Sequence, residues 1–185
     1  MTSNTTHVCP VAISIILNNR IRRWLQNPRK ILGPYIKEGM DVLEVGCGPG
    51  FFTIDMAQML GKSGQVVAVD LQESMLAKLR EKIEGSETEL NIVLHKCAAD
   101  KIGVSGNFDF VFLFYMVHEV ADKDAFFREL ESILKTDGLI YVVEPPLHVS
   151  KKAFEESIKI AGSAGLTVVD RPKRFPDKAV VLKKA

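Results

Sequence analysis

Residues 42–50 read Val-Leu-Glu-Val-Gly-Cys-Gly-Pro-Gly, an apolar run followed at once by three glycines in five positions. The apolar run predicts a buried strand, and the glycines predict a sharp turn into the amphipathic segment that begins at Phe51. Gly46, Gly48 and Gly50 allow the backbone to turn tightly and to approach a ligand where a Cβ would collide. An ordinary strand-to-helix turn is the alternative, because isolated glycine patterns are weak evidence of a site.

Apolar runs and amphipathic segments alternate along the rest of the chain, except for a turn-rich stretch after the third run. Predicted strands cover residues 42–45, 66–69, 92–94, 110–114 and 139–143, and predicted helices cover residues 51–60, 74–83, 125–134 and 153–161. This alternation predicts a parallel sheet with helices on both faces. The last two runs, 166–169 and 179–182, are joined by too few residues for a crossover helix and should pair antiparallel. The expected fold class is α/β: a Rossmann-like, seven-stranded, mostly parallel sheet with a C-terminal antiparallel strand.

A single domain is expected, since the chain has 185 residues, of which 46% are hydrophobic. An amphipathic helix with an arginine-rich polar face is predicted over residues 12–26. We therefore divide the domain into an N-terminal helical cap, residues 1–38, and a cofactor-binding core, residues 39–185. The cap is the predicted lid, and its arginines either face solvent or receive an anionic substrate.

Composition narrows the partners of the protein. A formal charge of +1, from 24 basic and 23 acidic side chains, gives no overall field that would attract nucleic acid or an anionic membrane. Three widely spaced cysteines suit free thiols in a reducing cytoplasm. The residues near the start do not resemble a secretory signal, and the apolar runs are shorter than a membrane span, so neither feature is expected. The expected partner is a small molecule in the cytoplasm, and the oligomeric state is left open.

The ligand class follows from three residues around the glycines. Asp70 ends the second predicted strand twenty residues beyond Gly50, the spacing at which an acidic side chain reaches ribose hydroxyls, although a cap for the next helix is the alternative. Phe51 occupies the place of the third glycine in G-x-G-x-x-G, which disfavours NAD. Glu44 would repel a pyrophosphate and attract the ammonium of a methionine moiety. These residues together favour S-adenosylmethionine.

In these motifs the chain resembles the class I S-adenosylmethionine-dependent methyltransferases over residues 39–185. Residues 108–114, Phe-Asp-Phe-Val-Phe-Leu-Phe, and residues 134–140, Leu-Lys-Thr-Asp-Gly-Leu-Ile, are similar to the family's fourth-strand motif and to the turn before its fifth strand. In detail the chain resembles the methyltransferase type 11 and quinone-biosynthesis-like branch, which includes small microbial members with a His-Glu pair after strand four. The resemblance implies methyl transfer to a small-molecule acceptor, with S-adenosylhomocysteine as product.

The resemblance also implies a set of cofactor contacts. Asp70 would bind the ribose, Leu71 would cover one adenine face, and Phe114 would lie near the sulfonium. The remaining implied contacts lie at the methionine end and in its loop: Glu44, Gly46, Cys47, Gly48 and Gly50.

One expected contact departs from the family pattern. In the family an acidic side chain after strand three often meets the adenine amino group, but this chain has Cys97-Ala98-Ala99-Asp100 there. Alignment through Ile102 places Ala98 at the acidic position. Ala99 would then contact adenine through its backbone, and Asp100 would either replace the missing acid or face solvent. The departure keeps open a non-catalytic, S-adenosylmethionine-binding or regulatory domain.

Candidate catalytic residues follow the fourth and fifth strands, whose ends meet at one edge of the sheet. Methyl transfer chiefly needs alignment of the acceptor, and a general base only where the accepting atom carries a proton. His118 is the first candidate for base or substrate orienter, and Glu119 and His148 are further candidates. The alternative for His118 is a core histidine held by a hydrogen bond. Glu144 is expected to be buried and to pair with a basic residue.

Two further hypotheses are less favoured by the sequence. A metal or metalloid site could be built from His7, Cys9, His118 and His148, but paired short spacing such as C-x-x-C is missing, and no metal is expected. A nicotinamide-dependent oxidoreductase is the competing enzyme class. An RNA or protein methyltransferase is disfavoured by the near-neutral charge.

Overall fold

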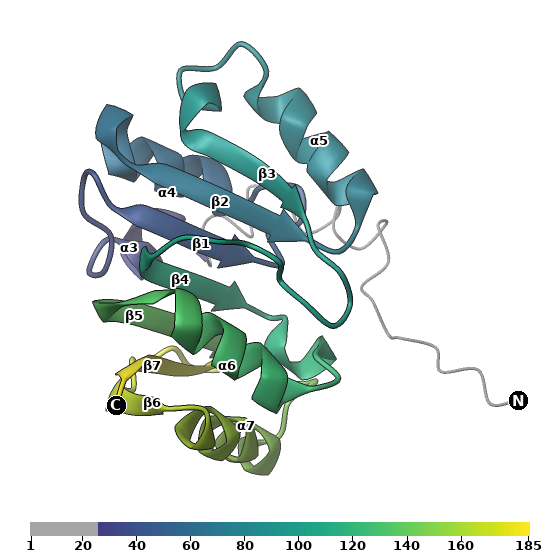
Figure 1. The fold of residues 1–185 in the computed structure, drawn as a ribbon, viewed down its shortest axis with the longest axis vertical. Helices are drawn as coiled ribbons and strands as arrows, with labels where there is room; N and C mark the ends of the chain where they lie inside the picture. Colours follow the sequence, from purple (N-terminus) through teal and green to yellow (C-terminus); the bar gives the residue numbers. More distant parts are fainter. Residues whose placement is uncertain (1–25) are drawn as a thin grey trace, which may run out of the picture.

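The computed structural model describes residues 26–185, which form a seven-stranded sheet in the order β3-β2-β1-β4-β5-β7-β6 (Figure 1). Strands β1 to β5 pair in parallel, and β7 is antiparallel to both of its neighbours. The strands are β1 Asp41–Val45, β2 Gln65–Asp70, β3 Ile92–Lys96, β4 Phe108–Phe114, β5 Leu134–Glu144, β6 Leu166–Asp170 and β7 Lys178–Lys184. The predicted seven-stranded sheet with its reversed strand is therefore confirmed.

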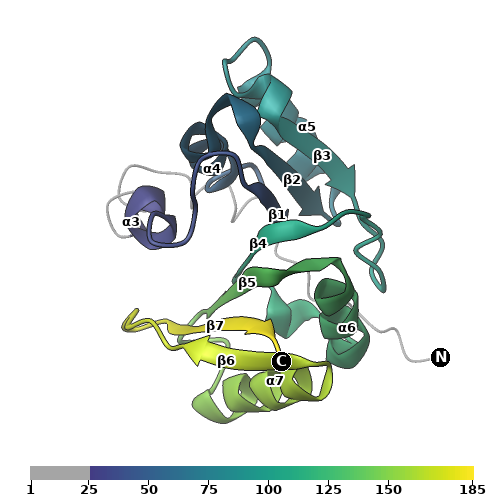
Figure 2. The same ribbon diagram turned by 60° about the vertical axis from the view of Figure 1, so that its left-hand side comes forward.

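Helices cover both faces of this sheet, as predicted (Figure 2). One face packs against α3 Pro28–Leu32, α4 Thr53–Leu60 and α5 Glu73–Ile83, and the other packs against α6 Lys123–Ile133 and α7 Lys151–Ser163. Short 3-10 turns are η1 Gly61–Ser63, η2 Glu89–Asn91 and η3 Val117–Glu119. In the central strand β4, Phe110 and Phe112 are buried on the first face, and Val111 and Leu113 on the second. Burial on both faces explains why β4 is almost continuously apolar.

Helix α3 was not predicted from the sequence. An Asn-Pro pair is typical of a break between segments, but Asn27 and Pro28 begin this helix. The side chain of Asn27 accepts a hydrogen bond from the Lys30 amide at 3.1 Å, and Pro28 occupies the first turn, where its missing N–H costs nothing. The predicted helix over residues 12–26, with its proposed role as a lid, lies almost wholly outside the described residues.

The boundary between α6 and β5 differs from the prediction by a few residues. The helix ends at Ile133, and β5 begins at Leu134, where we predicted the end of the helix and then a turn. Phe108 pairs with Leu134 and Phe110 pairs with Leu139, so four residues of β5 bulge out against one residue of β4. The predicted turn therefore exists as an irregularity inside the strand.

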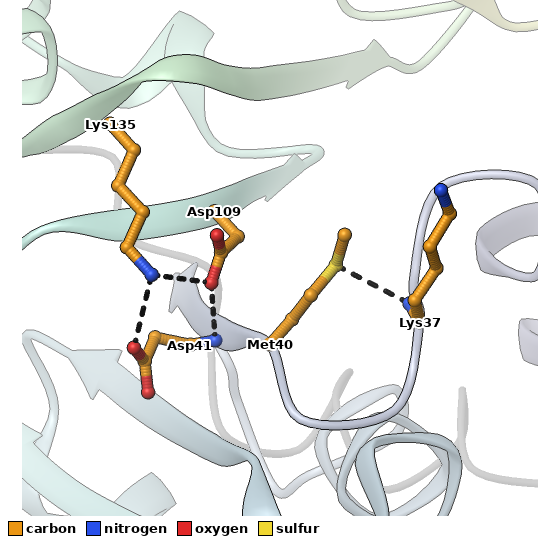
Figure 3. A network of polar contacts seen from close by, with 5 residues as sticks. All are labelled: Lys37, Met40, Asp41, Asp109 and Lys135. Atoms are coloured by element: carbon orange, nitrogen blue, oxygen red, sulfur yellow. Dashed lines mark hydrogen bonds and ion pairs between the residues drawn. The ribbon is translucent and has the colours of Figure 1, made fainter.

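This irregularity ties three strands together at the amino edge of the sheet (Figure 3). Lys135 donates to the carboxylates of Asp109, at 2.8 Å, and Asp41, at 3.3 Å, and the Asp41 amide donates to Asp109 at 2.8 Å. Nearby, the Lys37 amide donates to the sulfur of Met40. The network holds the starts of β1, β4 and β5, and leaves their carboxyl ends on the opposite edge for a site.

In the described part of the chain, no helix has both the length and the apolar character needed to cross a membrane.

Candidate functional site

The glycine loop, residues 46–50, connects β1 to α4 at the carboxyl edge of the sheet, where open α/β sheets bind ligands. Its three glycines have φ values of +77°, +55° and +83°, which glycine tolerates better than other residues. The amides of Gly46 and Cys47 both donate to the carbonyl of Val69, at 2.8 and 3.0 Å. These bonds fix the loop against the end of β2.

The three glycines differ in what surrounds them. A Cβ on Gly46 would lie 3.1 Å from the Cβ of Met116, and a Cβ on Gly50 would lie 2.3 Å from a methyl carbon of Leu79. A Cβ on Gly48 would meet no atom of the described residues within 4 Å. Gly48 therefore presents the open side of the loop, where a ligand can approach the backbone closely.

Asp70 lies directly beside this open side. Its carboxylate accepts the Gly48 amide and the Gln72 amide, each at 2.8 Å. Burial raises the pKa of Asp70, and the backbone hydrogen bonds from Gln72 and Gly48 oppose that rise. Gln72 is the N-cap residue of α5. Leu71, which lies between Asp70 and Gln72, is 37% exposed. The structure thus places the carboxylate at the end of β2 beside the glycine loop. This is the arrangement from which the sequence predicts a contact between Asp70 and ribose.

Glu44 adds a second carboxylate beneath the loop. It is buried and accepts a hydrogen bond of 2.5 Å from the hydroxyl of Thr53 on α4. Burial raises the pKa of the Cys47 thiol well above its ordinary value, and the charges of Glu44 and Asp70 raise it further. Cys47 therefore lies in a negative potential that both carboxylates create. This potential disfavours the binding of a pyrophosphate and favours the binding of a cationic group.

The segment after β3 is placed differently from these buried groups. The Cys97 amide donates to the carbonyl of Asp70 at 3.2 Å, so the segment begins beside the end of β2. Ala98, Ala99 and Asp100 are all exposed. The structure therefore brings this segment to the same edge and puts no buried acid in it.

The end of β4 is strained and anchored. Tyr115 has a φ of +59°, an uncommon value for a residue with a side chain, and its phenol donates to Asp177 at 2.5 Å. Phe114 is buried, with ring centroids 4.1 Å from Tyr115 and 4.6 Å from Phe52. The turn at Tyr115 brings Met116 against the glycine loop. Strain held in place by its surroundings is typical of functional sites.

His118 follows this turn on η3, and its ring forms a hydrogen bond with the carboxylate of Glu144. The Nδ1 atom of His118 lies 2.7 Å from Oε2 of Glu144, whose Oε1 accepts the Val117 amide at 3.0 Å. The hydrogen bond to Glu144 raises the pKa of His118. Desolvation and Lys123 oppose the rise, while the charges of Glu144 and Glu119 add to it. The predicted pairing of a buried Glu144 with a basic residue is present.

A cavity of about 230 Å³ opens beside this pair, and we name it the η3–α7 cavity. The rings of His118 and His148 are nearly parallel, at 15°, with centroids 6.2 Å apart. Glu119 is exposed and is not among the residues that line this cavity. Its lining residues are His118, Lys123, Glu144, His148, Val149, Ala153 and Ser157.

The structure describes two of the four residues that the metal hypothesis names. His118 and His148 lie near each other, whereas His7 and Cys9 lie outside the described residues. Among residues 26–185, no group of three or more histidine, cysteine or acidic side chains is arranged to hold a metal ion.

Several residues of the site were missed by sequence reasoning. Thr53, Tyr115 and Asp177 carry no local motif. Thr53 contacts Glu44 from the other side of the glycine loop, and Tyr115 contacts Asp177, which lies 62 residues away along the chain. Lys123 and Ser157 sit at ordinary helix positions, and their approach to His118 depends on how α6 and α7 pack. The positive φ of Tyr115 also has no signal in the sequence.

Comparison with known proteins agrees with this geometry. A family model described as a methyltransferase domain matches residues 36–170. The demethylmenaquinone methyltransferase of Bacillus cereus is 28% identical over 131 residues, which are 71% of this chain and 54% of that protein. The corresponding Staphylococcus aureus enzyme is 29% identical over 145 residues, 76% of this chain and 58% of its own length. This chain thus spans little more than half the length of these relatives.

A solved structure is similar over nearly the whole chain. A SAM-dependent methyltransferase from Aquifex aeolicus has a TM-score of 0.82 and 28% identity, with 95% of this chain and 98% of that one covered. Since the family model spans most of the chain, this protein belongs to the methyltransferase domain family, the class I S-adenosylmethionine-dependent methyltransferases. S-adenosylmethionine is the cofactor of this class, as the sequence predicted.

Proposed function

We propose that this protein transfers a methyl group from S-adenosylmethionine to a small-molecule acceptor. The observation that carries the proposal is the open side of the glycine loop at Gly48, which lies beside the carboxylate of Asp70 and close to buried Glu44. Negative potential at this loop suits a ligand with an ammonium and a ribose, and opposes the pyrophosphate of a nicotinamide cofactor. The family match over residues 36–170 supports most of the cofactor-binding core that we propose for residues 39–185.

The residues present fit the cofactor, and we assign them as follows. The space in front of Gly48 would be filled by a Cβ, so a bare backbone is suited to close approach by the methionine end, with Glu44 attracting its ammonium. Asp70 would bind the ribose hydroxyls, and the exposed Leu71 would cover the adenine. Exposed Ala98, Ala99 and Asp100 offer backbone groups and a carboxylate at the adenine edge. Bound there, S-adenosylmethionine supplies an electrophilic methyl group on its sulfonium.

His118 is proposed as the general base. Its Nδ1 is bonded to Glu144, which fixes the proton on that nitrogen in the neutral ring and leaves the lone pair on Nε2. The raised pKa makes this ring a stronger base than a free histidine. It would take the proton of the acceptor's hydroxyl, amine or carbon acid as the acceptor gains the methyl group. Glu119 would act through its charge on His118, and His148 would contact the acceptor.

The acceptor class is supported by the relatives. Two of them are demethylmenaquinone methyltransferases, so a quinone-type ring is the first acceptor class to test. Phe114, Tyr115 and Met116 would form the apolar side against which a flat ring packs, next to the glycine loop.

Calorimetric titration and methyl transfer test this proposal. The protein should bind S-adenosylhomocysteine and not NADH, and it should transfer label from S-adenosylmethionine to a reduced quinone or another small phenol. Binding of NADH alone would favour an oxidoreductase. Binding of S-adenosylhomocysteine without transfer to any acceptor in a metabolite extract would favour the regulatory domain instead.

A further inference from the structure

The η3–α7 cavity contains polar groups that the proposed role of His118 does not use. Lys123 comes from the first turn of α6, His148 from the segment before α7, and Ser157 from α7 itself. The volume of about 230 Å³ is many times the roughly 10–15 Å³ that is enough to hold one water molecule. It exceeds what a single ion needs and suits a small ring that carries an acidic group.

The charges around the cavity favour an anion. The carboxylate among the lining residues belongs to Glu144. One of its oxygens accepts a hydrogen bond from the Val117 amide, and the other contacts Nδ1 of His118. The Lys123 ammonium donates to the Val120 carbonyl at 3.3 Å, which uses one of its three donor hydrogens. In the neutral ring that acts as a base, Nδ1 of His118 still donates its hydrogen to Glu144, so the two other ammonium hydrogens of Lys123 remain available to a ligand. Protonation of His118 adds a positive charge beside the cavity.

The start of α7 strengthens this preference. Helix α7 is 13 residues long, and the Ser150 side chain accepts the Ala153 amide at its first turn. Ala153 and Ser157 both line the cavity, so the positive end of the helix lies next to it. The helix end, Lys123 and the paired histidines thus surround one space from three segments of the chain.

Resting on the methyl transfer proposed above, we propose that the η3–α7 cavity binds an oxyanion of the acceptor, a carboxylate or a phosphate, through Lys123 and His148. His118 is then next to both the bound acid and the atom that receives the methyl group. Within the quinone-type or phenolic class proposed above, the acceptor is then a ring compound that carries a carboxylate or phosphate in addition to its methylated atom.

Histidine ring resonances followed by NMR test the site with two probes, inorganic phosphate and benzoate. The chain has four histidines, so the rings can be assigned by single substitutions. A saturable shift of the His118 and His148 signals is expected with at least one probe, at a Kd of about 1–10 mM. Whichever probe binds more tightly identifies the acid as phosphate or carboxylate. S-adenosylhomocysteine binding is measured separately by calorimetry.

Two variants and a control decide the outcome. Lys123→Met should weaken probe binding about tenfold, because a hydrogen bond to a charged group is lost. Ala153→Leu should block binding by filling the cavity without changing its charge. Lys159→Met changes an exposed lysine on α7, with a 77% exposed side chain, and should bind the probe like the wild type.

The results separate the two proposals. The absence of a saturable shift with either probe, or equal probe affinity in Lys123→Met and the wild type, would overturn the cavity proposal. Failure of the wild type to bind S-adenosylhomocysteine would instead overturn the proposed function, whatever the probes do.

Discussion

Alanine at Gly48 should impair cofactor binding more than alanine at Gly50 does, whereas alanine at Gly50 should destabilise the fold more than alanine at Gly48 does. Both glycines have positive φ, +55° and +83°, so either substitution adds about 1–2 kcal/mol of backbone strain. The new Cβ at Gly50 would also lie 2.3 Å from Leu79 Cδ1, and overpacking of this kind costs about 1–3 kcal/mol more. We therefore expect Gly50→Ala to lose about 2–5 kcal/mol of unfolding free energy and Gly48→Ala about 1–2.

Cofactor affinity should follow the opposite order. The Cβ at Gly48 enters the open side of the loop, so the affinity for S-adenosylhomocysteine should fall at least about tenfold, equal to about 1.4 kcal/mol. Urea denaturation gives the free energies, and calorimetry on the folded variants gives the affinities.

Gly85 provides a matched control for this comparison. It has a φ of +70°, a Cβ there would meet no described atom within 4 Å, and it follows the C-terminal end of α5. Gly85→Ala should lose the same 1–2 kcal/mol as Gly48→Ala, about the strain of one left-handed residue, and should bind S-adenosylhomocysteine normally. Wild-type affinity in Gly48→Ala, or an equal loss of affinity in Gly85→Ala, would refute the assignment of the open side to the cofactor.

Three further predictions concern the histidine pair and the opposite edge. Glu144→Gln removes the charge that Nδ1 of His118 contacts, so the pKa of His118 should fall below its wild-type value in an NMR titration; an unchanged pKa would rule out the pair as its cause. Because the folded state raises this pKa, its contribution to stability is complete below the ordinary value of 6.5 and is lost as pH rises through the folded value. Urea denaturation between about pH 6 and about pH 8 should show that loss in the wild type and not in His118→Gln, and the same slope in both would contradict it. Asp109→Asn weakens a half-exposed ion pair with Lys135, so it should lower unfolding free energy by at most about 1 kcal/mol and leave cofactor affinity unchanged; a clear loss of affinity would show that the two edges are coupled.

Much of the fold was predictable because its signals are local. Short apolar runs, glycines and amphipathic spacing lie within a few residues of the elements that they indicate, and the reversed strand followed from a link too short for a helix. The errors fell at element boundaries. Asn27-Pro28 can end one segment or begin another, and in this chain Asn27 caps α3. Lys135 was assigned to a turn, and β4 pairing draws its neighbours into a bulged strand.

The candidate site was predictable in part, for a similar reason. The proximity of Asp70 and Gly48 could be predicted because each lies at the carboxyl end of a parallel strand, and such strands end at the same edge of the sheet. Tyr115 and Lys123 could not be found, because the first depends on a backbone strain and the second on the packing of two helices.

The glycine run at residues 46–50 and the acid at the end of the next strand are sequence properties, and they determined the class of fold and its ligand. Tertiary structure decided which glycine faces open space, since that depends on where Met116 and Leu79 pack. It also decided that His118 is paired, because its carboxylate partner, Glu144, lies 26 residues away along the chain. Short-range patterns fix the elements and their order. The chemistry of the site comes from contacts between segments that only the folded sheet brings together.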